Sequence, residues 1–252
     1  MNNLIILGSG RSGTSLTAGL FNKSGYYFGD NYISSSYSNP KGFYEDSEVN
    51  DINEKILFCT KPKKSPFLGE WVNEYDKKGS RWLVRLFPYS KLFSDELIEN
   101  RIKKIVSNEP FCFKDPRFCY TLPIWRKYLK NTLFICVFRE PEITAKSIIL
   151  ECRSSPYLKD VEISYESALD LWNILYKNIL MIKSDKQKWL FIHYDQIFTN
   201  EGIKKIQKFT GVNIDKNFPD KSLNRTKNKL KAPIEIQDTY HKLCKLADYS
   251  IK

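Results

Sequence analysis

A glycine-rich segment near the start of the chain, GSGRSGTS at residues 8–15, constrains the fold most strongly. It follows the apolar residues 4–7, which predict a buried strand, and it leads into residues 14–22, which have a helical pattern. A strand, a tight turn and a helix N-terminus together form a phosphate cradle, because backbone N–H groups and the helix dipole converge on one anion. The sequence therefore predicts an anion-binding loop in an α/β domain.

This loop nearly matches the triphosphate-binding pattern G-x-x-x-x-G-K-[ST], with Gly8, Gly13 and Ser15 in register. Thr14 stands where that pattern has the lysine for the β- and γ-phosphates, and a cation, Arg11, comes three residues earlier. We expect the loop to bind a phosphate group, but without the lysine contact to the β- and γ-phosphates that a triphosphate normally receives. A nucleotide kinase or NTPase stays open as an alternative, and so does a non-catalytic protein that binds a nucleotide or polyanion.

Apolar runs of strand length recur at residues 4–7, 111–113, 133–138 and 189–192, with a weaker candidate at residues 26–28. Helical patterns lie between or after them, at residues 48–58, 95–106, 143–152, 164–182, 201–209 and 234–247. This alternation predicts a P-loop-like three-layer sandwich, with a central, mostly parallel five-stranded sheet flanked by helices. Ligands of such sheets bind at the carboxyl ends of the strands.

The length of 252 residues suits one domain spanning residues 1–252, with an insertion around residues 60–93. That segment mixes prolines with aromatic residues, which either line a ligand pocket or pack on the domain. The aromatic residues of this segment include Trp71, Tyr75, Trp82, Phe87 and Tyr89.

The chain carries a net charge of +11, which suits an anionic ligand. Lysines are spread along the whole sequence and no nucleic-acid-binding motif is present, so we expect no nucleic-acid partner. The six cysteines lack C-x-x-C spacing, and we expect no metal site. We also expect no signal peptide or membrane span, and a cytoplasmic protein.

Charged residues follow two of the predicted strands. Lys114, Asp115 and Arg117 come directly after residues 111–113, where they place charge beside the cradle or form a surface salt-bridge turn. Arg139 follows residues 133–138, and Ser147 lies about two helical turns beyond it. An arginine and a hydroxyl in this arrangement suit a phosphate group.

Two further residues are candidates for a general base. His193 ends the last predicted strand, although a structural role is favoured for a histidine at that place. Glu45 follows the aromatic residues Phe43 and Tyr44, and is either a base or a solvated carboxylate at a helix start.

Taken together, these motifs resemble the sulfotransferases that use 3′-phosphoadenosine-5′-phosphosulfate (PAPS), most closely the bacterial branch that acts on sugars and other small hydroxylated acceptors. Residues 11–15 match the family's first motif, R-[ST]-G-[ST]-[ST], and Arg139 with Ser147 matches the spacing of its second. Further matches are the K-D-P segment at Lys114, the F-Y-E segment ending at Glu45, Tyr194 with its acidic neighbour, and the late basic segment ending at Arg225.

The resemblance implies transfer of a sulfuryl group from PAPS to an acceptor hydroxyl, with adenosine 3′,5′-bisphosphate as the product and no metal. It implies an acceptor that is a carbohydrate or another small molecule, and it places residues 60–93 on the acceptor side. It assigns catalysis to Glu45, Lys114 and Arg11. It assigns donor binding to Gly10, Arg11, Ser12, Gly13, Thr14, Ser15, Arg139, Ser147, Tyr194 and Arg225. The cytosolic steroid and phenol members have a lysine in the first loop and a histidine base, so we do not expect their acceptors here.

Overall fold

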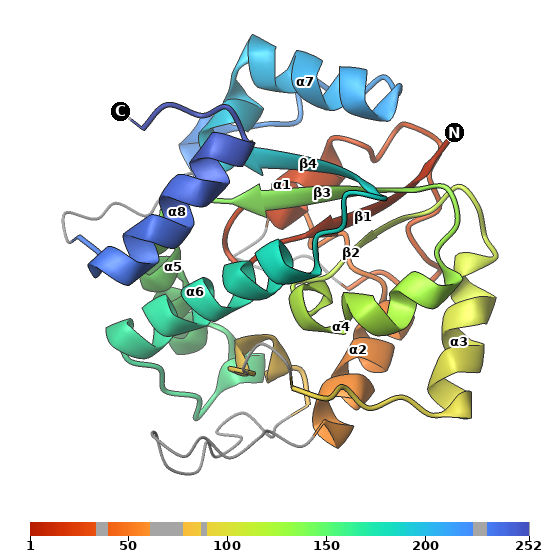
Figure 1. Cartoon of the computed structure of the whole chain (residues 1–252), viewed down its shortest axis with the longest axis horizontal. Coiled ribbons are helices and arrows are strands. Elements are labelled where there is room, and N and C mark those ends of the chain that lie inside the picture. Colours follow the sequence, from red (N-terminus) through yellow and green to blue (C-terminus); the bar gives the residue numbers. More distant parts are fainter. Residues whose placement is uncertain (34–39, 61–77, 87–89, 224–230, 252) are drawn as a thin grey trace.

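The computed structural model of the protein describes residues 1–33, 40–60, 78–86, 90–223 and 231–251. Its centre is a parallel sheet with strand order β2-β1-β3-β4 (Figure 1). The strands are β1 (Asn3–Leu7), β2 (Cys112–Lys114), β3 (Thr132–Phe138) and β4 (Lys188–His193). Because all four run the same way, their carboxyl ends meet at one edge of the sheet.

Helices cover both faces of this sheet. They are α1 (Thr14–Gly19), α2 (Ser47–Cys59), α3 (Glu96–Val106), α4 (Phe118–Trp125), α5 (Pro141–Ser154), α6 (Tyr165–Ile182), α7 (Asn200–Thr210) and α8 (Ile234–Leu246). Short 3-10 turns are η1 (Arg81–Leu83), η2 (Arg126–Tyr128), η3 (Pro156–Leu158), η4 (Tyr194–Phe198) and η5 (Lys221–Leu223).

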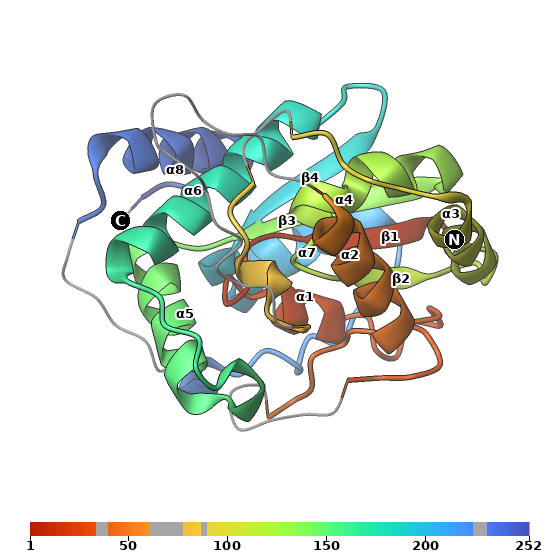
Figure 2. The same ribbon diagram turned by 90° about the horizontal axis from the view of Figure 1, so that it is seen from below.

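The strand residues alternate between two cores, which fixes the three layers. Leu4 and Ile6 of β1 pack with apolar residues of α1 and α7 on one face. Ile5 and Leu7 point to the other face, where α2, α3, α4, α5, α6 and α8 supply the apolar side chains. Figure 2 views the molecule from this second face, with the sheet behind the helices. The predicted parallel sheet between two helical layers is confirmed.

The sheet differs from the prediction in one respect, because it has four strands and not five in the described part of the chain. The weaker candidate, residues 26–28, makes a single parallel bridge between Tyr27 and Phe111. Gly25 and Gly29 flank it with φ values of 79° and 108° and turn the chain away on both sides. The apolar run is therefore a one-bridge extension beside β2.

The six helices predicted between residues 48 and 247 are present, with ends that differ by at most two residues. The sequence pattern missed α4 and overextended the first helix, which ends at Gly19. Nearly every side chain of α4 is buried, so the helix has no polar stripe, and Pro123 lies inside it. Among the described residues, no helix combines the length and the apolar character that a membrane crossing requires.

Candidate active site

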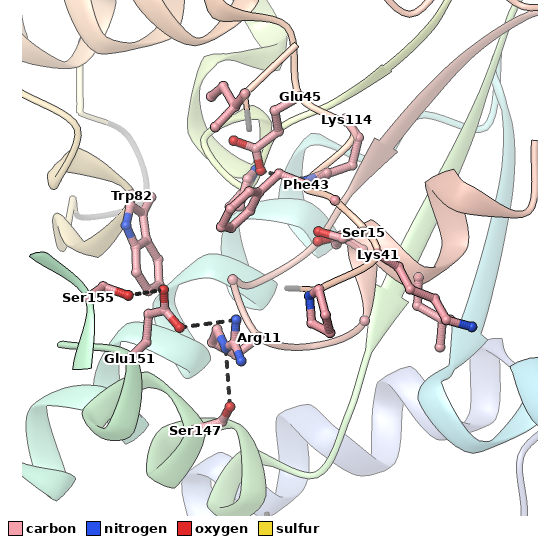
Figure 3. A pocket seen from close by; sticks show the side chains of 18 of the residues that line it. Arg11, Ser15, Lys41, Phe43, Glu45, Trp82, Lys114, Ser147, Glu151 and Ser155 are labelled. Carbon is pink, nitrogen blue, oxygen red and sulfur yellow. Dashed lines mark hydrogen bonds and ion pairs between the residues drawn. The ribbon is translucent and has the colours of Figure 1, made fainter. Parts of the chain in front are cut away.

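A cavity of about 800 Å³ lies at the carboxyl ends of the strands. The glycine-rich loop after β1, the ends of β2 and β3, and helix α5 all contribute to its wall. Residues 40–45 and Trp82 of η1 complete the wall. Figure 3 shows Glu45 and Lys114 at one end of this pocket, and Arg11, Ser147 and Glu151 at the other.

Backbone geometry and close packing shape the loop. Gly8 has a φ of 149°, and a Cβ added there would lie 2.1 Å from the carbonyl oxygen of Val137. Gly13 has a φ of 97°, and a Cβ there would lie 2.6 Å from the ring of Tyr194. Only glycine fits such positions without a shift of the neighbours, which explains the glycine spacing of the motif. The Tyr176 hydroxyl accepts from the Ser9 N–H at 3.1 Å and donates to Val137, which ties the loop to β3.

Arg11 extends from this loop to helix α5. Its backbone is left-handed, with a φ of 70°. Its Nε donates to the Ser147 hydroxyl at 3.2 Å, and its terminal nitrogen lies 3.2 Å from Oε2 of Glu151 (Figure 3). Ser147 and Glu151 are one helical turn apart, so the guanidinium lies along one face of α5. This contact joins the two predicted phosphate-binding motifs, which are 136 residues apart in the sequence.

Arg139 leaves the end of β3 and enters the same end of the cavity. Its guanidinium carbon lies 4.3 Å from the centre of the Tyr194 ring, in a cation–π contact. Arg139 is 6% exposed, and this burial lowers the pKa of its guanidinium below its ordinary value. A buried arginine whose flat face is fixed on an aromatic ring is oriented for a bidentate contact with an anion.

His193, the other candidate base, has a structural role. Its Nδ1 accepts from the backbone N–H of Asp195 at 3.2 Å, and its Nε2 lies 3.2 Å from the Tyr240 hydroxyl. The ring stacks on Tyr249, with 3.8 Å between the ring centres. Burial lowers the pKa of His193 to about 4, with a further contribution from the charge of Arg139. Because both ring nitrogens are engaged inside the protein, we assign no proton transfer to this residue.

Protonation of His193 is expected to weaken the fold in mild acid. The unfolded imidazole, with a pKa of 6.5, takes up a proton between pH 7 and pH 5, whereas the folded one, with a pKa of about 4, stays neutral. The free energy of unfolding therefore falls by about 2 kcal/mol over this window. Urea denaturation at both pH values, in the wild type and in His193→Asn, measures this difference. Glu140, whose pKa is raised by burial, is present in both proteins. An equal pH dependence in the two proteins would remove His193 as the cause.

Glu45 and Lys114 form a buried ion pair at the opposite end of the cavity. Lys114, the last residue of β2, is 2% exposed, and its ammonium group donates to Oε1 of Glu45 (Figure 3). Asp46, the next residue, caps α2 by accepting from the N–H groups of Glu48 and Val49. Asp46 rather than Glu45 thus occupies the helix-start position that one interpretation gave to Glu45, and Asp46 is itself buried. Glu45 itself is directed into the site.

Asp115 and Arg117 are buried next to this end of the cavity and are held by several hydrogen bonds. Asp115 is fully buried and accepts from Asn50, Asn53 and Arg117, at distances of 2.8–3.1 Å. Arg117 also donates to Glu54 at 2.6 Å. The interpretation of residues 114–117 as a surface salt-bridge turn is therefore wrong. Asp115 and Arg117 instead form an interior charge network with Glu54, directly after Lys114 in the chain.

The fold was compared with known proteins. Neither a scan against protein-family models nor a search of curated proteins gave a match. Among solved structures, a sulfotransferase domain from the curacin biosynthetic pathway aligns with 100% of this chain and 99% of its own length, at a TM-score of 0.55 and 17% identity. The chain has the sulfotransferase fold.

Two other solved structures agree with this assignment of the fold. The sulfotransferase domain of the Synechococcus PCC 7002 olefin synthase aligns with 99% of this chain and 95% of its own length, at a TM-score of 0.50 and 16% identity. The sulfotransferase STF9 from Mycobacterium avium aligns with 99% of this chain and 78% of its own length, at a TM-score of 0.50 and 13% identity.

Within this sulfotransferase fold, most of the sequence-predicted site residues line the one cavity. They are Gly10, Arg11, Gly13, Thr14, Ser15, Glu45, Lys114, Arg139, Ser147 and Tyr194. Ser12 is placed differently, because its side chain is fully buried behind the loop and interacts with Tyr176. Ser12 is therefore not among the residues that line the cavity. Arg225 lies outside the described residues, as do Trp71, Tyr75, Phe87 and Tyr89.

Sequence reasoning missed several residues of the site. Glu151 lies four residues after Ser147, a spacing that places both on one helix face once the helix is known. Tyr157 of η3 lines the cavity near the charges of Glu151, Glu45 and Arg11, and no motif points to it. Trp82, in contrast, was one of the aromatic residues predicted either to line a pocket or to pack on the domain; it lines the cavity, and its ring contacts Gly10 of the loop. The described residues contain no cluster of metal-ligating side chains.

Proposed function

We propose that the protein is a sulfotransferase that moves the sulfuryl group of PAPS to the hydroxyl group of an acceptor. The observation that carries this proposal is that one cavity holds the glycine-rich loop, the Arg139–Ser147 pair and the Glu45–Lys114 pair. The cavity volume of about 800 Å³ is in the range that accepts a nucleotide together with a small second substrate.

The loop end of the cavity suits the donor. In the proposed complex, loop N–H groups and the Thr14 and Ser15 hydroxyls contact the 5′-phosphosulfate, while Arg139 and Ser147 contact the 3′-phosphate. Tyr194 packs between Gly13 and Arg139, so the loop and the arginine are held at a fixed separation. Positioning of this kind is the main contribution of a protein to an in-line transfer between oxygens.

The end of the cavity that holds Glu45 and Lys114 suits the sulfuryl-transfer step. Glu45 takes the proton of the acceptor hydroxyl as the acceptor oxygen bonds to sulfur. The bond between sulfur and the bridging phosphate oxygen breaks, and the charge that develops on the phosphate is stabilised by Lys114. The products are the sulfated acceptor, adenosine 3′,5′-bisphosphate and a proton on Glu45, which is then lost to water.

The acceptor side of the proposal rests on the remaining wall of the cavity. Phe43, Trp82 and Tyr157 contribute aromatic side chains to it, and Asn50 adds an amide. Flat apolar surfaces with a few polar groups suit a small hydroxylated molecule, of which a carbohydrate is the class we predict.

The kinase or NTPase alternative has less support. It needs a carboxylate at a strand end that is available to Mg²⁺. Asp115 instead accepts hydrogen bonds from Asn50, Asn53 and Arg117, and Asp195 accepts from Tyr249. In place of the lysine of the triphosphate loop, Thr14 lines the cavity.

Thermal denaturation with added nucleotides tests the proposal. Adenosine 3′,5′-bisphosphate at a hundredfold excess over its Kd is expected to stabilise the fold by about 2.7 kcal/mol, and ATP with Mg²⁺ much less. Labelled PAPS with a panel of sugars and small alcohols then identifies the acceptor. Stabilisation by ATP alone would favour the kinase alternative, and binding of the bisphosphate without transfer to any acceptor would favour a non-catalytic protein.

A further inference from the structure

The proposed mechanism gives no role to Glu151, a carboxylate in the wall of the cavity. Glu151 of α5 lines the donor end, and its side chain is 2% exposed. Its Oε1 accepts from the Ser155 hydroxyl at 2.6 Å, and its Oε2 lies 3.2 Å from the guanidinium of Arg11 (Figure 3). Two partners from different segments therefore hold this carboxylate in one position.

A carboxylate in this place opposes the binding of an anion. Arg11, Arg139 and Ser147 gather at the same end of the cavity, and the charges of Arg11 and Arg139 are close enough to influence each other. A phosphate group that approaches Arg11 must share the guanidinium with Glu151, and it is repelled by the buried negative charge. The arrangement neutralises Arg11 before any ligand arrives.

We propose that Glu151 is an internal counter-ion of Arg11 that weakens the binding of adenosine 3′,5′-bisphosphate and so speeds its release. This inference rests on the proposed function, because it takes the bisphosphate as the product. Glu151 acts through Arg11 and is therefore a positioning residue that adjusts affinity. The hydrogen bond from Ser155 keeps the carboxylate beside Arg11 when a phosphate competes for the guanidinium.

The sign of the expected effect separates this role from a structural one. Loss of a purely structural ion pair loosens the site, which weakens ligand binding together with the fold. Loss of an internal competitor strengthens binding, because Arg11 then interacts with the phosphate alone. Arg11 keeps a side-chain exposure of 22%, so water can solvate its charge when Glu151 is neutral.

The test is the affinity of Glu151→Gln for adenosine 3′,5′-bisphosphate, measured by calorimetry, with the dissociation rate measured by stopped flow. We expect binding about tenfold tighter than in the wild type and a correspondingly slower dissociation. In turnover with PAPS, the donor KM and kcat should fall together, since the product leaves more slowly. A structural defect would instead raise the donor KM.

Two variants control for charge and shape. Glu151→Asp keeps the charge and should retain an affinity close to the wild type. Glu201→Gln removes an exposed carboxylate from α7, which does not line the cavity, and should change nothing. If Glu151→Gln does not fold, Glu151→Ala carries the same expectation.

The possible results distinguish the inference from the function on which it rests. Wild-type protein that fails to bind the bisphosphate overturns the proposed function. A wild type that binds, with folded Glu151→Gln or Glu151→Ala binding equally or more weakly, overturns the role of Glu151 and leaves the function standing. Equal tightening in Glu151→Asp would also overturn it, since charge would not be the cause.

Discussion

Replacing Glu45 by glutamine is expected to reduce sulfuryl transfer about a thousandfold, while the Kd for adenosine 3′,5′-bisphosphate stays within about threefold of the wild type. Glu45 lies at the Lys114 end of the cavity, away from Arg11 and Ser147, so the donor contacts remain (Figure 3). Glutamine has nearly the same shape and keeps a hydrogen-bond acceptor for Lys114, but it cannot take the acceptor proton. Steady-state transfer and calorimetric binding, measured on the same preparation, check both parts of the prediction.

A suitable control is Glu48→Gln, three residues further along the chain in the first turn of α2. Glu48 pairs with Arg101 and does not line the cavity, so this variant should transfer at the wild-type rate. Undiminished transfer in Glu45→Gln would remove Glu45 from the mechanism. Asp115 would then be tested as the base, despite the side chains that already donate to it.

Replacing Arg139 by glutamine is expected to raise the Kd for adenosine 3′,5′-bisphosphate at least a hundredfold. The Kd for adenosine 5′-monophosphate should rise by less than threefold. The proposed bidentate contact with the 3′-phosphate consists of two charge-assisted hydrogen bonds, and their loss is sufficient for an effect of this size. Because adenosine 5′-monophosphate lacks the 3′-phosphate, its affinity should hardly depend on Arg139. Calorimetry with both nucleotides measures the ratio directly.

Arg153→Gln is the matched control for this variant. Arg153 lies in the last turn of α5, is exposed and does not line the cavity. It removes one positive charge from the protein without touching the site, so both affinities should stay at their wild-type values. Equal losses for the two nucleotides in Arg139→Gln would count against a 3′-phosphate site at this residue.

The sequence predicted the parts of the site that lie close together along the chain. The order of β1, the glycine-rich loop and α1 follows from an apolar run, glycine spacing and a helical pattern within residues 4–19. The placement of Arg139 at the end of β3, followed by a helix with Pro141 at its start, is equally local. Helix α4 escaped prediction because it is buried on all sides, which removes the periodicity that sequence patterns detect.

The pairings inside the site were not predictable in this way. Glu45 and Lys114 are 69 residues apart, and Arg11 and Ser147 are 136 residues apart. Each residue stood out singly in the sequence, but no spacing rule connects segments that only the parallel sheet brings to one edge. The sequence placed Asp115 either beside the cradle or in a surface turn, whereas its bonds to Asn50, Asn53 and Arg117 show a buried anchor.

By itself, the sequence determined the fold class and the anion-binding loop, because backbone conformation, glycine placement and alternating apolar runs are local properties of the chain. Only the tertiary structure decided what surrounds that loop. It placed Glu151 beside Arg11 and directed the Ser12 side chain toward Tyr176. It also placed Glu45 rather than His193 in the cavity wall. Burial and charge pairing depend on side chains from distant segments, and these meet only when the sheet has assembled.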